Sequence, residues 1–498
     1  MARSKRQNQK YISFSGGVQS FTSPLLLNAD ETPLCYNVDI RQPGIIQKAG
    51  GYSQLGSGTG SADNRGIFSW DRENGDSELY QVYSNSLYKY NGTASGWATV
   101  GTAIGTTGDD PVEWAVHFVN TGTGVGSGAD SFVERLYISQ GLSQGTLRYT
   151  TGTSISSLAN VYAKHLASYK GRLYGGNVKQ GTKTHSTRFI WTDISGYNFP
   201  TDNYSDDMGE PITALKEYGG ALFVFTENKV SYYDEYNLTS VSTNGGVINS
   251  ETIQISEGKM LWYNRGGVYM YAGGDESSLT LISRPVTKWL DEVSDATSVT
   301  AGLDSKGRYC LYIGDVTVDS VSYSDVLLRY DILLNAWDIL KDRPFKYWTR
   351  NPSGGVYEVY TTNPDGQEVW QSDYGYSLNG SGQASSYDTP LLYGQAENID
   401  DFKTGYKVEV TYKPTGQSEY ITVKYRTDGT GSWNQIEGTN NNIDLSGTDD
   451  ISVTELVLPK GARGKFLQLQ LSHNSSVDGF RIYEINLKYD VELFERND

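Results

Sequence analysis

The chain has 498 residues, and its 41 basic and 58 acidic side chains give a formal net charge of −17. An acidic protein repels the phosphate backbone, so this composition argues against a protein that reads DNA sequence. The mean hydropathy is −0.49, and no apolar run reaches the roughly 18 residues of a membrane helix, which excludes a transmembrane span. With only Cys35 and Cys310, disulfides cannot build the fold, and a cytosolic origin is expected.

Residues 1–55 are predicted to form an N-terminal arm. Its basic tip carries Arg3, Lys5, Arg6 and Lys10, and no apolar segment of a secretory signal follows. Further on, apolar residues lie beside Gly and Pro, so the arm is expected to pack on the body of the protein or on a neighbour.

Residues 56–373 repeat one sequence pattern, a turn that contains glycine followed by a short strand, as in Lys170-Gly171-Arg172 and Glu257-Gly258-Lys259. The strand clusters recur every 43 to 51 residues, roughly the period of four-stranded propeller blades. They start near Gly66, Val112, Ala163, Ile212, Ile255, Val299 and Phe345. The sequence therefore predicts an all-β fold, a β-propeller of about six to eight blades, with seven as the count.

Two polar segments interrupt the strands, at 192–211 and 235–250. Long loops in a compact domain are usually functional or interfacial, so both are expected to project from one rim of the propeller. The residues singled out in them are Asn198, Phe199, Asp206, Asp207, Asn237 and Asn244.

One short helix is predicted after Pro285, where Val286, Trp289, Leu290 and Val293 repeat at helical spacing. Residues 374–390 are rich in Gly, Ser and Tyr and are interpreted as a linker. Residues 391–498 alternate apolar and polar side chains and predict a β-sandwich module, part of which could instead close the propeller.

No catalytic pattern is present in the sequence. The four histidines are scattered, no Gly-x-Ser-x-Gly elbow occurs, and no pair has the spacing of zinc ligands. We therefore predict that the chain is not an enzyme and has neither a cofactor nor a metal.

A family resemblance rests on Asn37-Val38-Asp39 and the following 44–52, which ends in Lys48-Ala49-Gly50-Gly51-Tyr52. This opening resembles that of phage tail nozzle proteins, the tail tubular protein B and packaged-DNA stabilisation group of short-tailed phages. Downstream, residues 166–174 and 212–225 are similar to the body of the same group.

The resemblance implies a structural virion protein, made in the host cytoplasm and assembled as a hexameric ring at the distal end of the tail. Double-stranded DNA would pass through this ring without sequence-specific binding, past acidic side chains. The loops at 192–211 and 235–250 would close the channel until ejection, and the basic arm would dock on the adjoining tail protein.

Two alternatives remain open. The 38 Tyr and 10 Trp residues could stack on sugar rings, as in a glycan-binding or glycan-cleaving propeller. The module after Leu391 could instead hold a tail fibre, as a fibre adaptor would.

Overall fold

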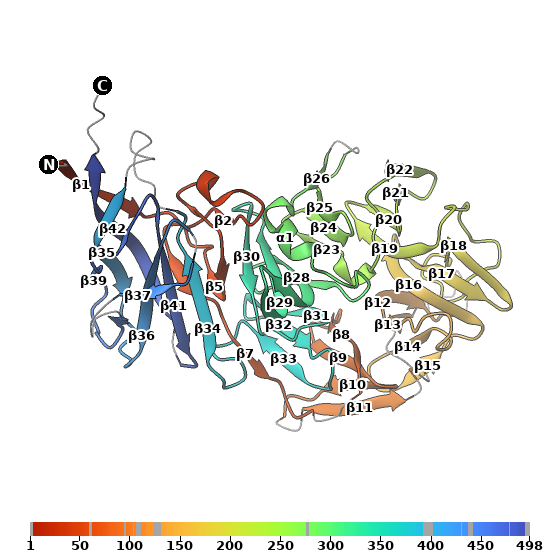
Figure 1. The fold of residues 1–498 in the computed structure, drawn as a ribbon. Coiled ribbons are helices and arrows are strands. Elements are labelled where there is room, and N and C mark those ends of the chain that lie inside the picture. The colour runs from red at the N-terminus through yellow and green to blue at the C-terminus, as the bar shows by residue number, and fades with distance from the viewer. Residues whose placement is uncertain are drawn as a thin grey trace.

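The computed structural model describes residues 3–493, apart from 59–61, 94–95, 103, 106–110, 123–130, 275–277, 392–401, 430, 437–441 and 478. The described chain is almost entirely β-structure, with a propeller at one end and a sandwich at the other (Figure 1). This confirms the all-β propeller fold predicted from the sequence.

Seven sheets follow one another along the chain as the blades of the propeller. Six are separate sheets, and the seventh, β27–β30, belongs to a larger sheet that continues into the sandwich. The first blade contains β8 (Asn64–Asp71), β9 (Ser77–Tyr83), β10 (Ser86–Tyr90) and β11 (Trp97–Thr102). The second contains β12 (Trp114–Asn120), β13 (Phe132–Ile138), β14 (Arg148–Thr150) and β15 (Ile155–Ser157). The third contains β16 (Val161–Tyr169), β17 (Arg172–Gln180) and β18 (Lys183–Trp191), and the fourth contains β19 (Ile212–Tyr218), β20 (Ala221–Thr226), β21 (Val230–Tyr233) and β22 (Leu238–Ser242). The last three are β23 (Gln254–Ser256), β24 (Lys259–Asn264), β25 (Gly267–Tyr271) and β26 (Leu279–Leu281); β27 (Thr300–Leu303), β28 (Tyr309–Val318), β29 (Val321–Asp331) and β30 (Ala336–Leu340); and β31 (Trp348–Ser353), β32 (Val356–Thr362), β33 (Val369–Ser372) and β7 (Tyr52–Gln54).

The propeller closes between its last and first blades. The backbone amide of Ser69 in β8 donates to the Thr349 hydroxyl of β31 over 2.8 Å. The outer strand of the last blade is β7, which comes from the N-terminal segment and pairs antiparallel with β33. The last blade is therefore built from an N-terminal strand and three later strands, and this pairing closes the propeller.

The turns between strands form as the sequence predicts. Lys170 and Gly171 join β16 to β17 with φ values of 44° and 70°. Two successive residues with positive φ match the right-handed twist of the paired strands, which is why a glycine recurs at these turns. Asn74 and Gly75 lie in a longer turn that joins β8 to β9, in which Gly75 alone has a positive φ, 86°.

The sandwich packs two sheets face to face. One contains β39 (Ser452–Val457), β35 (Lys403–Lys413), β42 (Arg481–Leu493), β6 (Ile46–Lys48), β5 (Val38–Asp39), β1 (Arg3–Tyr11) and β40 (Arg463–Gly464). The other continues from β30 through β4 (Cys35–Tyr36), β34 (Gln383–Asp388), β41 (Leu467–Ser475), β36 (Tyr420–Thr427), β37 (Asn434–Gln435) and β38 (Asn442–Asp444). The described chain also contains a short parallel pair, β2 (Gly17–Val18) and β3 (Glu31–Thr32), and the 3₁₀ turns η1 (Pro24–Leu26) and η2 (Ser250–Thr252).

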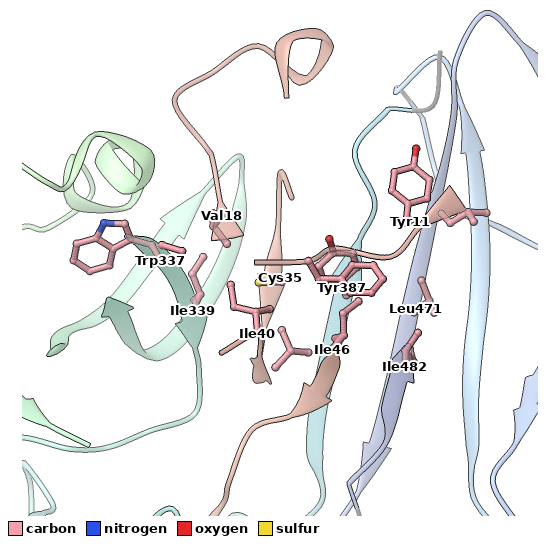
Figure 2. Close-up of a cluster of buried hydrophobic side chains, with 14 of the residues drawn as sticks. Tyr11, Val18, Cys35, Ile40, Ile46, Trp337, Ile339, Tyr387, Leu471 and Ile482 are labelled. Atoms are coloured by element: carbon pink, nitrogen blue, oxygen red, sulfur yellow. The ribbon is translucent and has the colours of Figure 1, made fainter. Parts of the chain in front are cut away.

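The N-terminal segment, residues 3–55, lies between the two bodies of the protein, the propeller and the sandwich. Its apolar side chains fill the space between β30 of the propeller and strands β34, β41 and β42 of the sandwich (Figure 2). The buried side chains labelled there are Tyr11, Val18, Cys35, Ile40, Ile46, Trp337, Ile339, Tyr387, Leu471 and Ile482. Residues 1–55 therefore supply strands to both bodies, whereas the sequence predicted an arm.

Three further expectations differ from the structure. Residues 374–390 were interpreted as a linker, but they contain β34, whose Ser385 and Ser386 are buried between β4 and β41. The predicted loop at 235–250 contains β22, the outer strand of its blade. The helix is shorter than predicted: a 3₁₀ turn, η4 (Arg284–Val286), leads into α1 (Thr287–Leu290), which ends before Val293. In the first two cases, small polar side chains are accommodated in strands, which composition alone does not reveal.

Candidate functional site: the central cavity

A cavity of about 560 Å³ lies on the axis of the propeller. Residues of, or just before, the first strand of each blade line it, so all seven blades contribute. Pockets that hold small molecules have volumes of about 300–1,000 Å³ and are commonly shared between structural units. The axis cavity is therefore the candidate site of this protein.

Glu113, which directly precedes β12, is held in place by three hydrogen bonds. His165 Nδ1 lies 2.7 Å from Oε1, and the Ser250 hydroxyl donates to the same oxygen. The Leu166 backbone amide donates to Oε2 over 3.0 Å. Burial opposes ionisation of this carboxyl, but His165 and the hydrogen bonds outweigh it and place the pKa of Glu113 below its ordinary value. Glu113 is thus a fixed carboxylate that ties three blades together.

The surroundings of Glu251 disfavour ionisation of its carboxyl, in contrast to those of Glu113. It lies in η2, where the Asn249 side chain accepts a hydrogen bond from the Glu251 amide over 3.1 Å. Burial among the blades and, to a smaller extent, the negative charge of Glu113 together raise the pKa of Glu251 to about 8, with Lys216 opposing the shift. Among the described residues, no side chain or backbone group bonds to the Glu251 carboxyl. Glu251 belongs to the lining of the cavity, and a pKa of about 8 leaves its carboxyl mostly protonated at neutral pH.

Aromatic rings form another part of the lining. The rings of Phe68 and Trp114 stack with centroids 5.6 Å apart. Trp348 packs closely against β27 at Gly302, where an added Cβ would lie 2.1 Å from the indole Cγ. Glycine is therefore required at position 302 because the indole approaches the backbone so closely.

The side chains of Glu113, His165 and Ser250 are not arranged for nucleophilic catalysis. A catalytic serine needs a base that accepts its proton. Ser250 and His165 each bond to Glu113 instead. Both oxygens of Glu113 already accept hydrogen bonds, so the carboxylate is poorly placed to act as a base on a substrate. The arrangement favours binding over chemistry. The sequence prediction that the chain is not an enzyme stays a prediction.

The residues singled out from the sequence lie elsewhere. Segment 192–211 runs along β18, with Ser205 N bonded to Phe189 O over 2.9 Å, and Phe199 is buried in the core. Asn198, Asp206, Asp207, Asn237 and Asn244 are exposed and belong to segments next to β18, β19 and β22 of the third and fourth blades. None of the six lines the cavity. The role of these two segments as gates remains a prediction.

The basic tip is part of a strand. Arg3, Lys5 and Arg6 fall in β1, whose backbone pairs with β42. Lys10 Nζ lies 3.0 Å from a carboxylate oxygen of Glu484 in the same pair. Docking of this tip on another protein also remains a prediction.

Sequence reasoning missed the cavity residues because they lie far apart in the chain. Ser250 and Glu113 are separated by 137 residues. One signal was available: Glu113, Ser250 and Glu251 all sit just before the first strand of a blade. Aligning the predicted blades on their first strands would have grouped these residues.

Sequence reasoning also missed a buried ionic cluster between the propeller and the N-terminal segment. Asp39 of β5 bonds to Arg308 over 2.9 Å and to Lys306 over 2.6 Å. Arg329 binds both oxygens of Asp338, at 2.8 and 2.9 Å. Burial opposes ionisation of Asp39, but Arg329, Arg308 and Lys306 hold its pKa far below the ordinary value. The cluster gives the Asn37-Val38-Asp39 motif a structural role.

Other kinds of site were not found in the part of the chain that the structure describes. Within it, no group of three or more His, Cys, Asp or Glu side chains is placed to hold a metal ion. Over the same residues, no helix has the length and hydropathy needed to cross a membrane.

Comparison with known proteins identifies no relative. No family model matches the chain, and no curated protein matches it. Among solved structures it is similar to the WD40 β-propeller domain of Doa1, with 10% identity and a TM-score of 0.38 over 65% of this chain and 97% of that one. It is also similar to the extracellular domain of the putative hybrid two-component system BT4673 from B. thetaiotaomicron, with 10% identity and a TM-score of 0.39 over 79% of this chain and 47% of that one. These likenesses are too distant to bear on function.

Proposed function

We propose that this chain is the subunit of a ring-shaped nozzle at the distal end of a short phage tail, a virion protein that retains packaged DNA and forms the channel for its ejection. The residues that resemble the nozzle family support this proposal, because they connect the two bodies: Asp39 joins the ionic cluster, and the Gly50 carbonyl accepts from Arg343 over 2.7 Å. The observation that carries the proposal is a sheet with two complementary open edges.

The edges belong to the seven-stranded sheet of the sandwich. Strands β39, β35, β42 and β1 pair antiparallel in that order, and β39 and β1 have no further strand partner among the described residues. Because strand direction alternates, β39 of a second copy can pair beside β1 and keep the alternation without turning the copy around. Such head-to-tail contacts form a closed ring when the rotation between subunits closes.

The amino-acid sequences of the two edge strands also differ in charge. β1 contains Arg3, Lys5, Arg6 and Lys10, whereas Asp449, Asp450 and Glu455 lie in or beside β39. Opposite charges on matching surfaces steer association and fix its register. Attraction between edges therefore favours the head-to-tail arrangement over pairing of like edges.

Exposed apolar side chains also lie at the β39 edge. Ile451, Val453 and Val457 are 60%, 60% and 68% exposed. An open strand that carries exposed valines is a site for pairing with another chain unless it is covered. In the proposed ring, the neighbouring β1 covers this edge.

In this proposal the ring is a homohexamer that contacts the adjoining tail protein. DNA passes through the opening between subunits, where the net charge of −17 per chain limits adhesion of the phosphate backbone. The cavity inside each propeller plays no part in this passage.

The test uses Val453→Lys, which places a charged side chain on the β39 edge, and Val356→Lys as a matched control. Val356 is a 67% exposed valine in β32 of the propeller. Mass photometry and negative-stain imaging should show rings for the wild type and the control, and monomers with an unchanged melting temperature for Val453→Lys. Rings should also weaken at high salt, because exposed charges are screened. A wild-type protein that stays monomeric at all concentrations would refute the ring, and rings formed by Val453→Lys would refute this edge.

A further inference from the structure

We propose that the axis cavity of the propeller binds a neutral saccharide, with the rings of Trp114 and Trp348 against the sugar and Glu251 and Gln254 bonded to its hydroxyl groups. This inference does not depend on ring assembly, because it concerns the inside of a single subunit.

The polar groups of the cavity suit hydroxyl groups. A protonated Glu251 offers one O–H donor and one carbonyl acceptor, and each sugar hydroxyl can both donate and accept. Gln254 is fixed by a 2.9 Å bond from its Nε2 to the Ala301 carbonyl. Its amide oxygen has no partner among the described residues and is left to accept. Ser168 adds a hydroxyl to the lining.

The aromatic rings provide apolar faces beside these polar groups. Trp114 is held by stacking on Phe68, and Trp348 by its contact with Gly302. Both residues are only partly buried and belong to the lining of the cavity, and Trp348 also packs on the core beside it. A sugar ring has apolar C–H faces and polar edges, so it matches a site with aromatic walls and a few directional polar groups.

The charge of the lining favours a neutral ligand. The lining contains the basic residues Lys216 and Arg350 beside the acidic residues Glu113 and Glu217, and Glu251 is mostly uncharged at neutral pH. A nucleotide or another polyanion needs a cluster of cations or a row of free backbone amides. A polyamine needs carboxylates that are ionised and not already bonded, and both oxygens of Glu113 already accept hydrogen bonds.

The proposal predicts a dependence on pH. The other ionisable residues that line the cavity with Glu251 are Glu113, Lys216, Glu217, Tyr347 and Arg350, and His165 bonds to Glu113. As the pH rises through about 8, Glu251 loses its proton and with it the donor for a sugar hydroxyl. The site also gains a second negative charge near Glu113. The affinity for a neutral saccharide should therefore fall about tenfold between pH 6.5 and pH 9, the effect of losing one hydrogen bond.

The experiment screens the full-length protein at pH 6.5 on an array of neutral and acidic glycans. Hits are then measured by saturation-transfer NMR and calorimetry, with lactose, maltose, cellobiose and diacetylchitobiose as soluble neutral probes, and sialyllactose and ATP as charged ones. Glu251→Leu removes both hydrogen-bonding groups, Glu251→Gln keeps an uncharged donor and acceptor, and Glu257→Gln is the control in an exposed turn of the same blade.

We expect a neutral glycan to bind the wild type and Glu257→Gln equally. Glu251→Leu should lose at least tenfold in affinity, while Glu251→Gln binds within a few-fold of the wild type and no longer weakens at pH 9. Three results would overturn the proposal: no glycan binds the folded wild type, only charged probes bind, or Glu251→Leu binds as well as the wild type. Circular dichroism of each variant separates lost binding from lost folding.

Discussion

Replacing Glu251 by Gln should make the protein more stable, and increasingly so as the pH rises. In the unfolded chain this carboxyl ionises near its ordinary value of 4.5, whereas in the folded protein burial beside Glu113 raises its pKa to about 8. Between these values the unfolded state releases the proton and the folded state keeps it. The free energy of unfolding therefore falls as the pH rises from about 4.5 to 8 and changes no further above that range.

The size of the effect follows from the two pKa values. Each unit of difference corresponds to about 1.4 kcal/mol. Between pH 6 and pH 8 the folded carboxyl goes from protonated to half ionised, while the unfolded one stays ionised. The linkage relation then gives a loss of about 2 kcal/mol for the wild type over this interval. The glutamine variant has no proton to lose at this position and is spared that loss.

The assay is urea denaturation of both proteins at pH 6 and pH 8, followed by tryptophan fluorescence. The quantity of interest is the difference between variant and wild type, which removes groups common to both, such as Asp388, whose pKa burial raises to about 6. This difference should grow by about 2 kcal/mol from pH 6 to pH 8. If it is the same at both pH values, Glu251 does not titrate in the predicted range, and the electrostatic account of the cavity is wrong.

Three further changes test the packing of the fold. Asp39→Asn removes a carboxylate from Arg308 and Lys306, although Arg308 keeps its 2.6 Å bond to Asp304, and should cost about 1–3 kcal/mol, seen as a lower melting temperature; an unchanged value would show that Asp39 contributes no net stability. Gly302→Ala places a Cβ 2.1 Å from Trp348 Cγ and should cost about 1–3 kcal/mol with a shift in tryptophan emission, whereas a silent substitution would mean that the indole does not lie on β27. Gly75→Ala, at φ 86° in an open turn, should cost about 1 kcal/mol, and a gain in stability there would contradict the turn geometry.

The propeller could be predicted because its signals are local. The predicted cluster start at Ile212 coincides with the first residue of β19, and the largest difference is that between Phe345 and Trp348, where β31 begins. Each turn and its strand are encoded within about ten residues by a positive-φ position and a run of β-formers. Blade count and blade boundaries follow from that repetition.

The sandwich and the cavity depend on contacts between distant residues. The segment 374–390 resembles a linker in composition, yet β34 pairs with β4 and β41, and the Asn37 side chain donates to the Ala384 carbonyl over 2.8 Å. These two residues are 347 positions apart. Nothing in a window of local sequence can specify such a pairing. The site was missed for the same reason, since its residues come from separate blades.

The way in which the N-terminal segment joins the two bodies has a mechanical consequence. β7 completes the last propeller blade, β1, β5 and β6 belong to one sheet of the sandwich, and β4 links β30 to the other sheet. To separate the bodies, the chain would have to break these strand pairings, expose the apolar core between them and uncover the Asp39 cluster. Each buried pair broken in this way leaves an unpaired charge, which is costly in a buried setting. The sandwich and the propeller therefore move together, and a subunit that assembles through the β39 and β1 edges would hold its propeller at a fixed angle to the channel.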